Sequence, residues 1–312
     1  MLKKIICLFS CFSLFLPLFA QKTSIRLGVL KGNGCLPCAY LIENKEKLSV
    51  QNMAFQIFNS EREELPKLLR GELDVAFLYA KDAAKVFDKS KKGIVFLGVA
   101  QNEALYLLTN DETYGSLEDI KGKSIIAPEE NSQETRIFKH ILNKKNISVG
   151  NDDSSVKLDF SLPQAQFANS LISLSQSYAL VREPFASVAI FNSSKNLRAE
   201  NIQKIYAENE EGSNIPLMLL VARADFVKNN RDIIRRFIDV YKNAMQWTNK
   251  NPSKAALLIE KHKLGLSAPI AKNAIPYSSL VFREATVAKS DLEKLYTILG
   301  SELPSEEFYF SK

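Results

Sequence analysis

The chain has 312 residues, of which 46% are hydrophobic and 24% charged, and this composition excludes disorder over most of its length. Its net charge of +6 comes from basic residues that are interspersed with acidic ones. Because no basic stripe with interleaved aromatic residues is present, we expect no binding to nucleic acid. The length is enough for two modest domains.

The first twenty residues have the pattern of a secretion signal. Residues 1–4 are short and basic, residues 5–19 are nearly all apolar, and Ala20 offers a small residue at the cleavage position. The apolar run is shorter than the roughly 20 residues that a membrane-spanning helix needs. We therefore expect residues 1–20 to be removed and the mature protein to be periplasmic or otherwise extracytoplasmic. Residues 8–11 loosely resemble a lipoprotein box, so lipid tethering at Cys11 is the alternative.

Strands and helices alternate in the first third of the chain. We predict strands over residues 25–30, 50–58 and 74–78, each followed by a helix that begins near Cys38, Ser60 and Asp82 respectively. Such alternation favours a parallel sheet with helical crossovers. Residues 94–99 and 104–109 are two apolar runs that we expect to form one long bent strand leaving this sheet.

A second α/β unit follows, and then a helical region. We predict strands over 124–127, 156–160, 178–181, 202–206 and 215–222, and helices over 132–142, 164–176, 185–191, 233–247, 252–262, 268–273 and 289–299. A chain that leaves one lobe and returns to it crosses between the lobes twice. The cleft between two such lobes is a favoured place for a small-molecule site.

Five segments, in this order, resemble the solute-binding proteins of bacterial ABC importers, in the nitrate, sulfonate, taurine and thiamine-precursor branch. They are IRLGVLKGNGCLPCAYLIEN, LPKLLRGELDVAFL, GSLEDIKGKSIIAP, VREPFASVAI and LPSEEFYF. The resemblance covers nearly the whole mature chain and implies the type II periplasmic-binding fold. In this α/β fold two lobes are joined by two crossover strands, and here residues 21–102 with 213–312 would form one lobe and residues 103–212 the other.

The resemblance implies a protein that captures a small polar, anionic or heteroaromatic solute by lobe closure and delivers it to a permease in the inner membrane. Such a protein is a monomer, needs no cofactor and is not an enzyme. One alternative is an enzyme similar to the thiamine-pyrimidine synthases, which share the fold. Those enzymes carry a denser cysteine motif than CLPC and work inside cells, so the signal sequence counts against it. The other alternative is a binding module that serves a sensor kinase.

The resemblance also implies which loops face the ligand. Ligand identity is not implied, because Cys35, Cys38 and Arg182 depart from the family pattern. The expected ligand-binding residues are Asn33, Gly34, Cys35, Cys38, Asn59, Ser60, Tyr79, Gln101 and Asn102 in the first lobe, Glu129, Asn131, Ser132, Gln133, Arg182 and Glu183 in the second, and Ser213 and Asn214 at the returning crossover.

Cys35 and Cys38 form a C-x-x-C motif at the start of a predicted helix. A disulfide that stiffens this loop is the plainest outcome in an oxidising compartment. Thiols or a disulfide touching the ligand, and a dithiol redox site whose thiolate the helix end stabilises, are the alternatives. Only His140 and His262 could add to a metal site, and both lie far along the chain, so we expect none.

Three other features each have two interpretations. Residues 131–133 could donate hydrogen bonds to a polar or anionic group, or form an ordinary helix N-cap. The Arg182-Glu183 pair could place a cation in the cleft for bidentate recognition of an anion, or be a surface ion pair. Tyr79 and Tyr106 could stack on a flat heterocycle, or belong to the core. No Ser-His-Asp pattern, P-loop or dinucleotide fingerprint is present.

Overall fold

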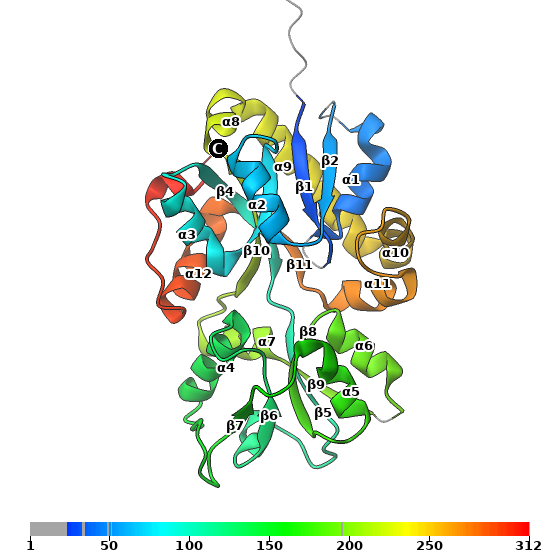
Figure 1. The fold of residues 1–312 in the computed structure, drawn as a ribbon, viewed down its shortest axis with the longest axis vertical. Coiled ribbons are helices and arrows are strands. Elements are labelled where there is room, and N and C mark those ends of the chain that lie inside the picture. Colours follow the sequence, from blue (N-terminus) through cyan, green and yellow to red (C-terminus); the bar gives the residue numbers. More distant parts are fainter. Residues whose placement is uncertain (1–23, 33–34, 49, 51, 195, 312) are drawn as a thin grey trace, which may run out of the picture.

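The structure, a computed structural model, describes residues 24–32, 35–48, 50, 52–194 and 196–311. The predicted signal sequence with Cys11, and the predicted site residues Asn33 and Gly34, lie outside the described residues. The chain folds into two α/β lobes stacked along the long axis of the molecule, each built on its own sheet (Figure 1). The fold class predicted from the sequence is therefore confirmed.

The first lobe contains a six-stranded sheet with the order β11-β4-β10-β3-β1-β2. β1 pairs in parallel with β2 and β3, whereas β10 runs antiparallel between β3 and β4. The parallel part reflects the alternating strands and helices at the start of the chain. The strands are β1 (Arg26–Leu30), β2 (Ala54–Phe58), β3 (Val75–Tyr79), β4 (Ile94–Asn102), β10 (Pro216–Arg223) and β11 (Leu280–Glu284).

Helices cover both faces of this sheet (Figure 1). They are α1 (Cys38–Asn44), α2 (Glu61–Leu69), α3 (Ala80–Lys89), α8 (Ala224–Asn229), α9 (Arg231–Lys250), α10 (Pro252–Lys261), α11 (Ala268–Ala274) and α12 (Ala285–Ile298), with short 3₁₀ turns η2 (Lys45–Lys47), η5 (Ile275–Tyr277) and η6 (Glu306–Phe308). The aromatic residues near the end of the chain pack against this lobe. The ring of Phe308 stacks on that of Phe96, with 5.6 Å between the ring centroids. No helix among the described residues is long and apolar enough to serve as a membrane span.

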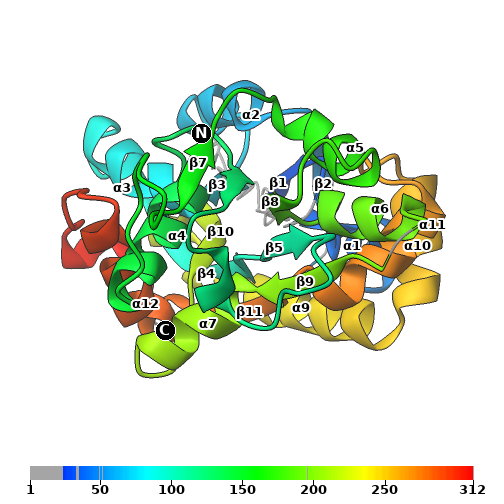
Figure 2. The ribbon, with the colours of Figure 1, turned by 90° about the horizontal axis from the view of Figure 1, so that it is seen from below.

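The second lobe contains a five-stranded sheet with the order β7-β6-β8-β5-β9. Seen from its end in Figure 2, α5 and α6 lie on one side of this sheet and α4 and α7 on the other. The strands are β5 (Leu105–Thr109), β6 (Ser124–Ile126), β7 (Lys157–Asp159), β8 (Tyr178–Arg182) and β9 (Arg198–Asn201). The helices are α4 (Gln133–Lys144), α5 (Phe167–Ile172), α6 (Phe185–Asn192) and α7 (Ile202–Asn209), with 3₁₀ turns η3 (Leu117–Ile120) and η4 (Gln164–Gln166).

The two connections between the lobes run side by side. The chain leaves the first sheet at the end of β4 and returns to it at the start of β10, where Asn102 is paired with Pro216. The amide of Glu103 donates to the carbonyl of Ile215 at 2.7 Å, so a ladder hydrogen bond continues into the crossover itself. The long bent strand expected over 94–109 is instead two strands, β4 and β5, that belong to different sheets.

Two other expectations about secondary structure are wrong. Residues 202–206, predicted as a strand, begin helix α7, because Asn201 caps this helix by accepting a hydrogen bond from the Lys204 amide. Ile202, Ile205 and Tyr206 are buried at the i, i+3, i+4 spacing of a helix. The region after residue 225, predicted to be helical, also contains the edge strand β11.

Candidate functional site

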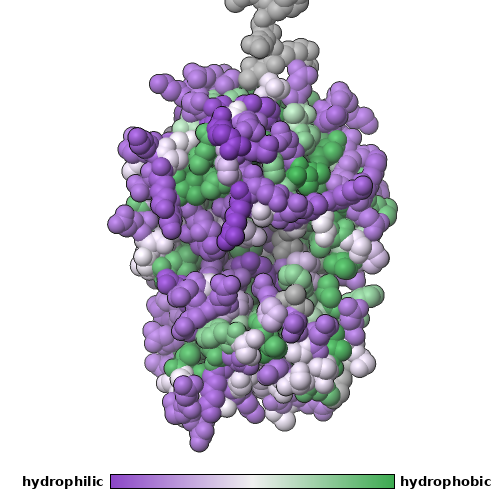
Figure 3. Space-filling view, viewed as in Figure 1, coloured by the Kyte–Doolittle hydropathy of each residue, from purple (hydrophilic) through white to green (hydrophobic). Residues whose placement is uncertain are grey.

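A continuous cleft separates the two lobes. It consists of two cavities of about 370 and 360 Å³, which share Tyr79, Gln164, Arg182 and Leu217 as lining residues. We call the first the α4 half, because residues at the start of α4 line it, and the second the β1 half, because Leu30 and Lys31 line it. In the view of Figure 3 both lobes are largely hydrophilic at the surface, with hydrophobic side chains in small groups.

The structure brings together part of the predicted site. Tyr79, Glu129, Ser132, Gln133 and Arg182 line the α4 half. Tyr79 and Arg182 also line the β1 half, together with Gln101 and Glu183. These residues come from the carboxyl ends of β3, β4 and β8, from the loop before α4 and from the first residue of α4, which is where an open α/β sheet places its ligands.

Other predicted residues do not line the cleft. Asn131 is exposed beside it, and Asn59 accepts a hydrogen bond from Lys31 at the surface. Three polar residues at the crossovers, Asn102, Asn214 and Ser213, form hydrogen bonds within the protein. Asn102 donates to Asn214, Asn214 donates to Asp291, and Ser213 accepts from Lys294. Ser60 is the N-cap residue of α2.

The expected disulfide between Cys35 and Cys38 is wrong, because both residues are free cysteines with no exposed surface. Cys35 Sγ accepts a hydrogen bond from the Leu30 amide at 3.3 Å, and both side chains pack in the main hydrophobic core. They fill space there as small apolar groups. Burial raises the pKa of both thiols, so neither has the character of a reactive thiolate, and neither lines the cleft.

Behind the cysteines lies a buried carboxyl group. Glu64 is fully buried, and its Oε2 has no hydrogen-bond partner among the described residues. Burial raises the pKa of Glu64 well above its usual value. Its carboxyl lies where a Cβ on Gly28 of β1 would be, and the sheet therefore needs a residue without a side chain at this position.

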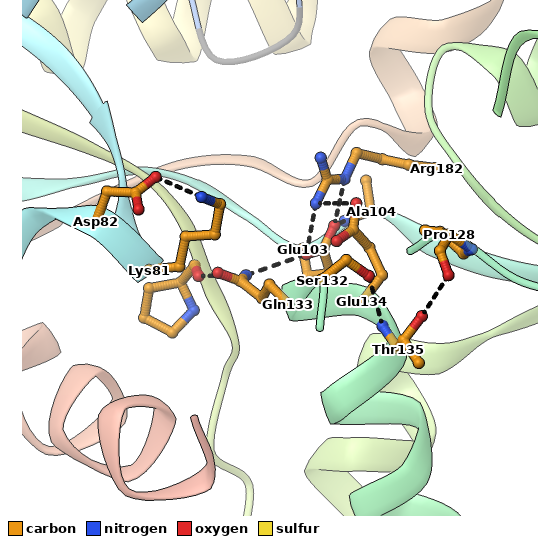
Figure 4. Close-up of polar contacts among 11 residues, drawn as sticks. Lys81, Asp82, Glu103, Ala104, Pro128, Ser132, Gln133, Glu134, Thr135 and Arg182 are labelled. Atoms are coloured by element: carbon orange, nitrogen blue, oxygen red, sulfur yellow. Dashed lines mark hydrogen bonds and ion pairs between the residues drawn. The ribbon is translucent and has the colours of Figure 1, made fainter. Parts of the chain in front are cut away.

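Arg182, at the end of β8, is the centre of a buried ionic network (Figure 4). Its Nε lies 3.0 Å from Glu103 Oε1, and its Nη2 lies 2.7 Å from Glu134 Oε1. Glu103 is fully buried in the crossover, and Glu134 belongs to the first turn of α4. Burial opposes the charge on Arg182, yet the two carboxylates raise its pKa. Arg182 therefore does not form a surface ion pair. It lines the cleft with its charge already paired to Glu103 and Glu134.

In two glutamine side chains of the cleft walls, the amide nitrogen donates a hydrogen bond and the amide oxygen has no partner among the described residues. Gln133 Nε2 donates to Glu103 Oε2 and to the Pro216 carbonyl, both at 3.2 Å. Gln101 Nε2 donates to the Ser278 carbonyl at 2.8 Å. Backbone carbonyls only accept, which fixes the orientation of both amides. The oxygens Oε1 of Gln101 and Gln133 are buried and have no partner among the described residues.

Glu183 forms part of the wall of the β1 half. It follows β8 directly, and the peptide bond to Pro184 is cis. Its carboxyl group accepts hydrogen bonds from the hydroxyl of Ser187 at 3.0 Å and from the Ser187 amide at 3.3 Å. Burial raises the pKa of Glu183 to about 7, although these hydrogen bonds favour the carboxylate.

The two tyrosines differ in their placement. Tyr79 is partly exposed and lines both halves of the cleft, so its ring is available to a ligand. Tyr106 is 7% exposed and belongs to the core of the second lobe. Its hydroxyl donates to the Tyr277 carbonyl of the first lobe at 3.0 Å.

Sequence reasoning missed several residues of the cleft. Glu134 directly follows Gln133, and Lys81 lies two residues after Tyr79 and forms an ion pair with Asp82. Glu103 lies 79 positions before Arg182, and no local pattern connects them. Leu217 and Gly265 line the cleft from segments that come late in the chain. Within the described residues, no group of three or more His, Cys, Asp and Glu side chains is arranged to hold a metal ion.

A comparison with protein families finds one match. The family model described as NMT1/THI5 like matches residues 61–255, which include both crossovers and most of the cleft. A search of curated proteins finds no match.

Solved structures share the fold over nearly the whole chain. An ABC transporter protein of Parabacteroides distasonis is 18% identical with a TM-score of 0.75, and the alignment covers 93% of this chain and 99% of that one. The aliphatic sulphonate binding protein SsuA of Escherichia coli is 13% identical with a TM-score of 0.67, covering 92% of each chain. The nitrate-binding protein NrtA of Synechocystis PCC 6803 is 13% identical with a TM-score of 0.57, covering 88% of this chain and 80% of that one.

Proposed function

The chain belongs to the NMT1/THI5-like family, and from this membership and the geometry of its cleft we propose that it is the solute-binding protein of an ABC importer. Solved structures with the same two-lobed fold are named as ligand-binding components of ABC-type import systems and as sulfonate- and nitrate-binding proteins. The proposal includes an extracytoplasmic location, an N-terminal signal, action as a monomer, delivery to an inner-membrane permease and no catalysis.

One observation carries the proposal, namely a cleft whose walls come from both lobes. Tyr79 and Gln101 belong to the first lobe, whereas Gln133 and Arg182 belong to the second. A solute held between them contacts both lobes only when they are close together. Its differential affinity for the closed state therefore drives closure, by bending at the paired crossovers near Asn102 and Pro216.

Two measurements on the same preparation test the function. Native mass spectrometry of protein purified without denaturation should show a bound small molecule that is released on unfolding. Small-angle scattering should show a smaller radius of gyration when this solute is returned to protein refolded without it. Exchange of Gln133 for Ala should weaken binding, whereas exchange of the exposed Lys254 on α10 for Ala should not. Failure to find a solute, together with an unchanged radius with extracts of the native source, would overturn the proposal.

A further inference from the structure

The cations that line the cleft already have partners, which are counter-ions for Arg182 and Lys81 and a neutral amide for Lys31. The Arg182 guanidinium is shared by Glu103 and Glu134, so its positive charge is already balanced from within the protein. Lys81 pairs with Asp82, and Lys31 donates to Asn59 at the exposed rim. Glu129 and Glu183 add two more carboxyl groups to the lining. An anionic solute would therefore meet several carboxyl groups, and each cation of the lining already has a partner.

The uncharged polar groups favour the same kind of solute. Gln101 and Gln133 are 0% and 2% exposed, and each lines one half of the cleft with an Oε1 that has no partner among the described residues. A buried acceptor without a donor costs roughly 1–3 kcal/mol. A solute that brings N–H groups to both oxygens removes this cost, whereas a nitrate or sulfonate, which only accepts, cannot.

The start of helix α4 is the feature that would favour an anion, because a helix N-terminus carries partial positive charge. In this chain its first turn already includes the carboxylate of Glu134, and the Ser132 hydroxyl accepts a hydrogen bond from the Thr135 amide at 3.2 Å. The partial charge is thus compensated from within the protein.

We propose that the solute is a small organic cation whose N–H groups donate to Gln101 and Gln133, with its charge balanced by the carboxylates around Arg182. This inference rests on the proposed solute-binding function and names the chemical class of the solute. Amines, amidines and protonated nitrogen heterocycles have this chemistry, and the ring of Tyr79, which lines both halves, offers such a cation an aromatic face.

Solutes that share a ring and differ in charge test this class. Isothermal titration calorimetry compares benzamidinium with benzenesulfonate, and phenethylammonium with phenylpropionate, at pH 8 and low salt. We expect each cation to bind at least tenfold more tightly than its anionic counterpart. The variant Glu134→Gln removes one negative charge from the α4 half and should weaken cation binding about tenfold.

The matched control is Glu130→Gln, which removes the same charge from an exposed side chain that pairs with Lys139 and does not line the cleft. It should bind the cations as the unmodified protein does. Preference for the anions, or equal loss in both variants, would overturn the inference and leave the solute-binding function standing. If neither the cations nor the anions bind, and no solute co-purifies with the protein, both the class of solute and the solute-binding function would be overturned.

Discussion

Arg182 Nη2 lies 2.7 Å from Glu134 Oε1, which joins the end of β8 to the first turn of α4 at the floor of the cleft. The same guanidinium reaches Glu103 in the crossover at 3.0 Å. Arg182 therefore ties the second lobe to the chain segment about which the lobes would move. This single side chain therefore lines the cleft and also contacts the crossover.

Replacing Arg182 by Met should destabilise the protein by about 3–5 kcal/mol, because Glu103 would be left buried without its cation. Arg182→Lys should lose less, since it keeps the charge but not the forked geometry. Urea unfolding followed by circular dichroism measures both. A loss below about 1 kcal/mol for Arg182→Met would show that the network adds little to stability.

Glu183 should make stability depend on pH in an unusual direction for a carboxyl group. Its pKa in the folded protein is about 7, against an ordinary value of 4.5. Between these two values the folded state holds a proton that the unfolded state has lost. The free energy of unfolding should therefore fall as pH rises from about 4.5 to 7, by at most about 1.4 kcal/mol per pH unit from this group, and then level off.

The difference between the unmodified protein and Glu183→Gln isolates this contribution, because other titrating groups are common to both. Unfolding in urea at pH 5, 6, 7 and 8 should show the variant gaining relative stability up to pH 7. A constant difference across this range would contradict the raised pKa of Glu183.

Gly28→Ala should destabilise the first lobe by roughly 1–3 kcal/mol, because the added methyl group overlaps the buried carboxyl of Glu64. In the Glu64→Ala background the same change should cost much less. A double-mutant cycle from thermal or urea unfolding then gives a coupling energy of about 1 kcal/mol or more. Additive losses would show that the two positions are independent.

Cys35 and Cys38 should resist alkylation in the folded protein, because both thiols are buried and burial raises their pKa. Iodoacetamide applied before and after unfolding, followed by peptide mass spectrometry, distinguishes the states. Both residues should be modified only after unfolding and without a reductant. A requirement for reductant would show that the pair is oxidised in the isolated protein.

The sequence predicted the two-lobed fold because its signals are local. The alternating strands and helices up to residue 90 repeat in the second lobe, and the turn at Glu183-Pro184 falls where expected at the end of β8. The carboxyl ends of β3, β4 and β8 supplied Tyr79, Gln101 and Arg182 to the cleft. For these residues the rule that ligands bind at strand ends was sufficient.

The partners of these residues could not be predicted in the same way. Whether Arg182 faces an anion or is neutralised depends on Glu103, 79 positions away, and on Glu134 in the first turn of α4. The C-x-x-C motif indicated a disulfide, yet both cysteines are free thiols that the hydrophobic core shields from solvent. Such pairings arise from tertiary packing, which no spacing along the chain records.

The place of β10 in the first sheet has a consequence for how the chain acquires its structure. β10 lies between β3 and β4, but it follows them only after the whole of the second lobe has been passed. In an emerging chain that stops before residue 216, β3 can pair with β1, but β4 has neither of its neighbours, β10 and β11. The six-stranded sheet is therefore complete only after the second lobe has been made, and we expect such long-range strand pairing to slow its folding. For the export that we propose, a first lobe completed this late would leave the chain unfolded for longer and so able to pass through a translocation pore.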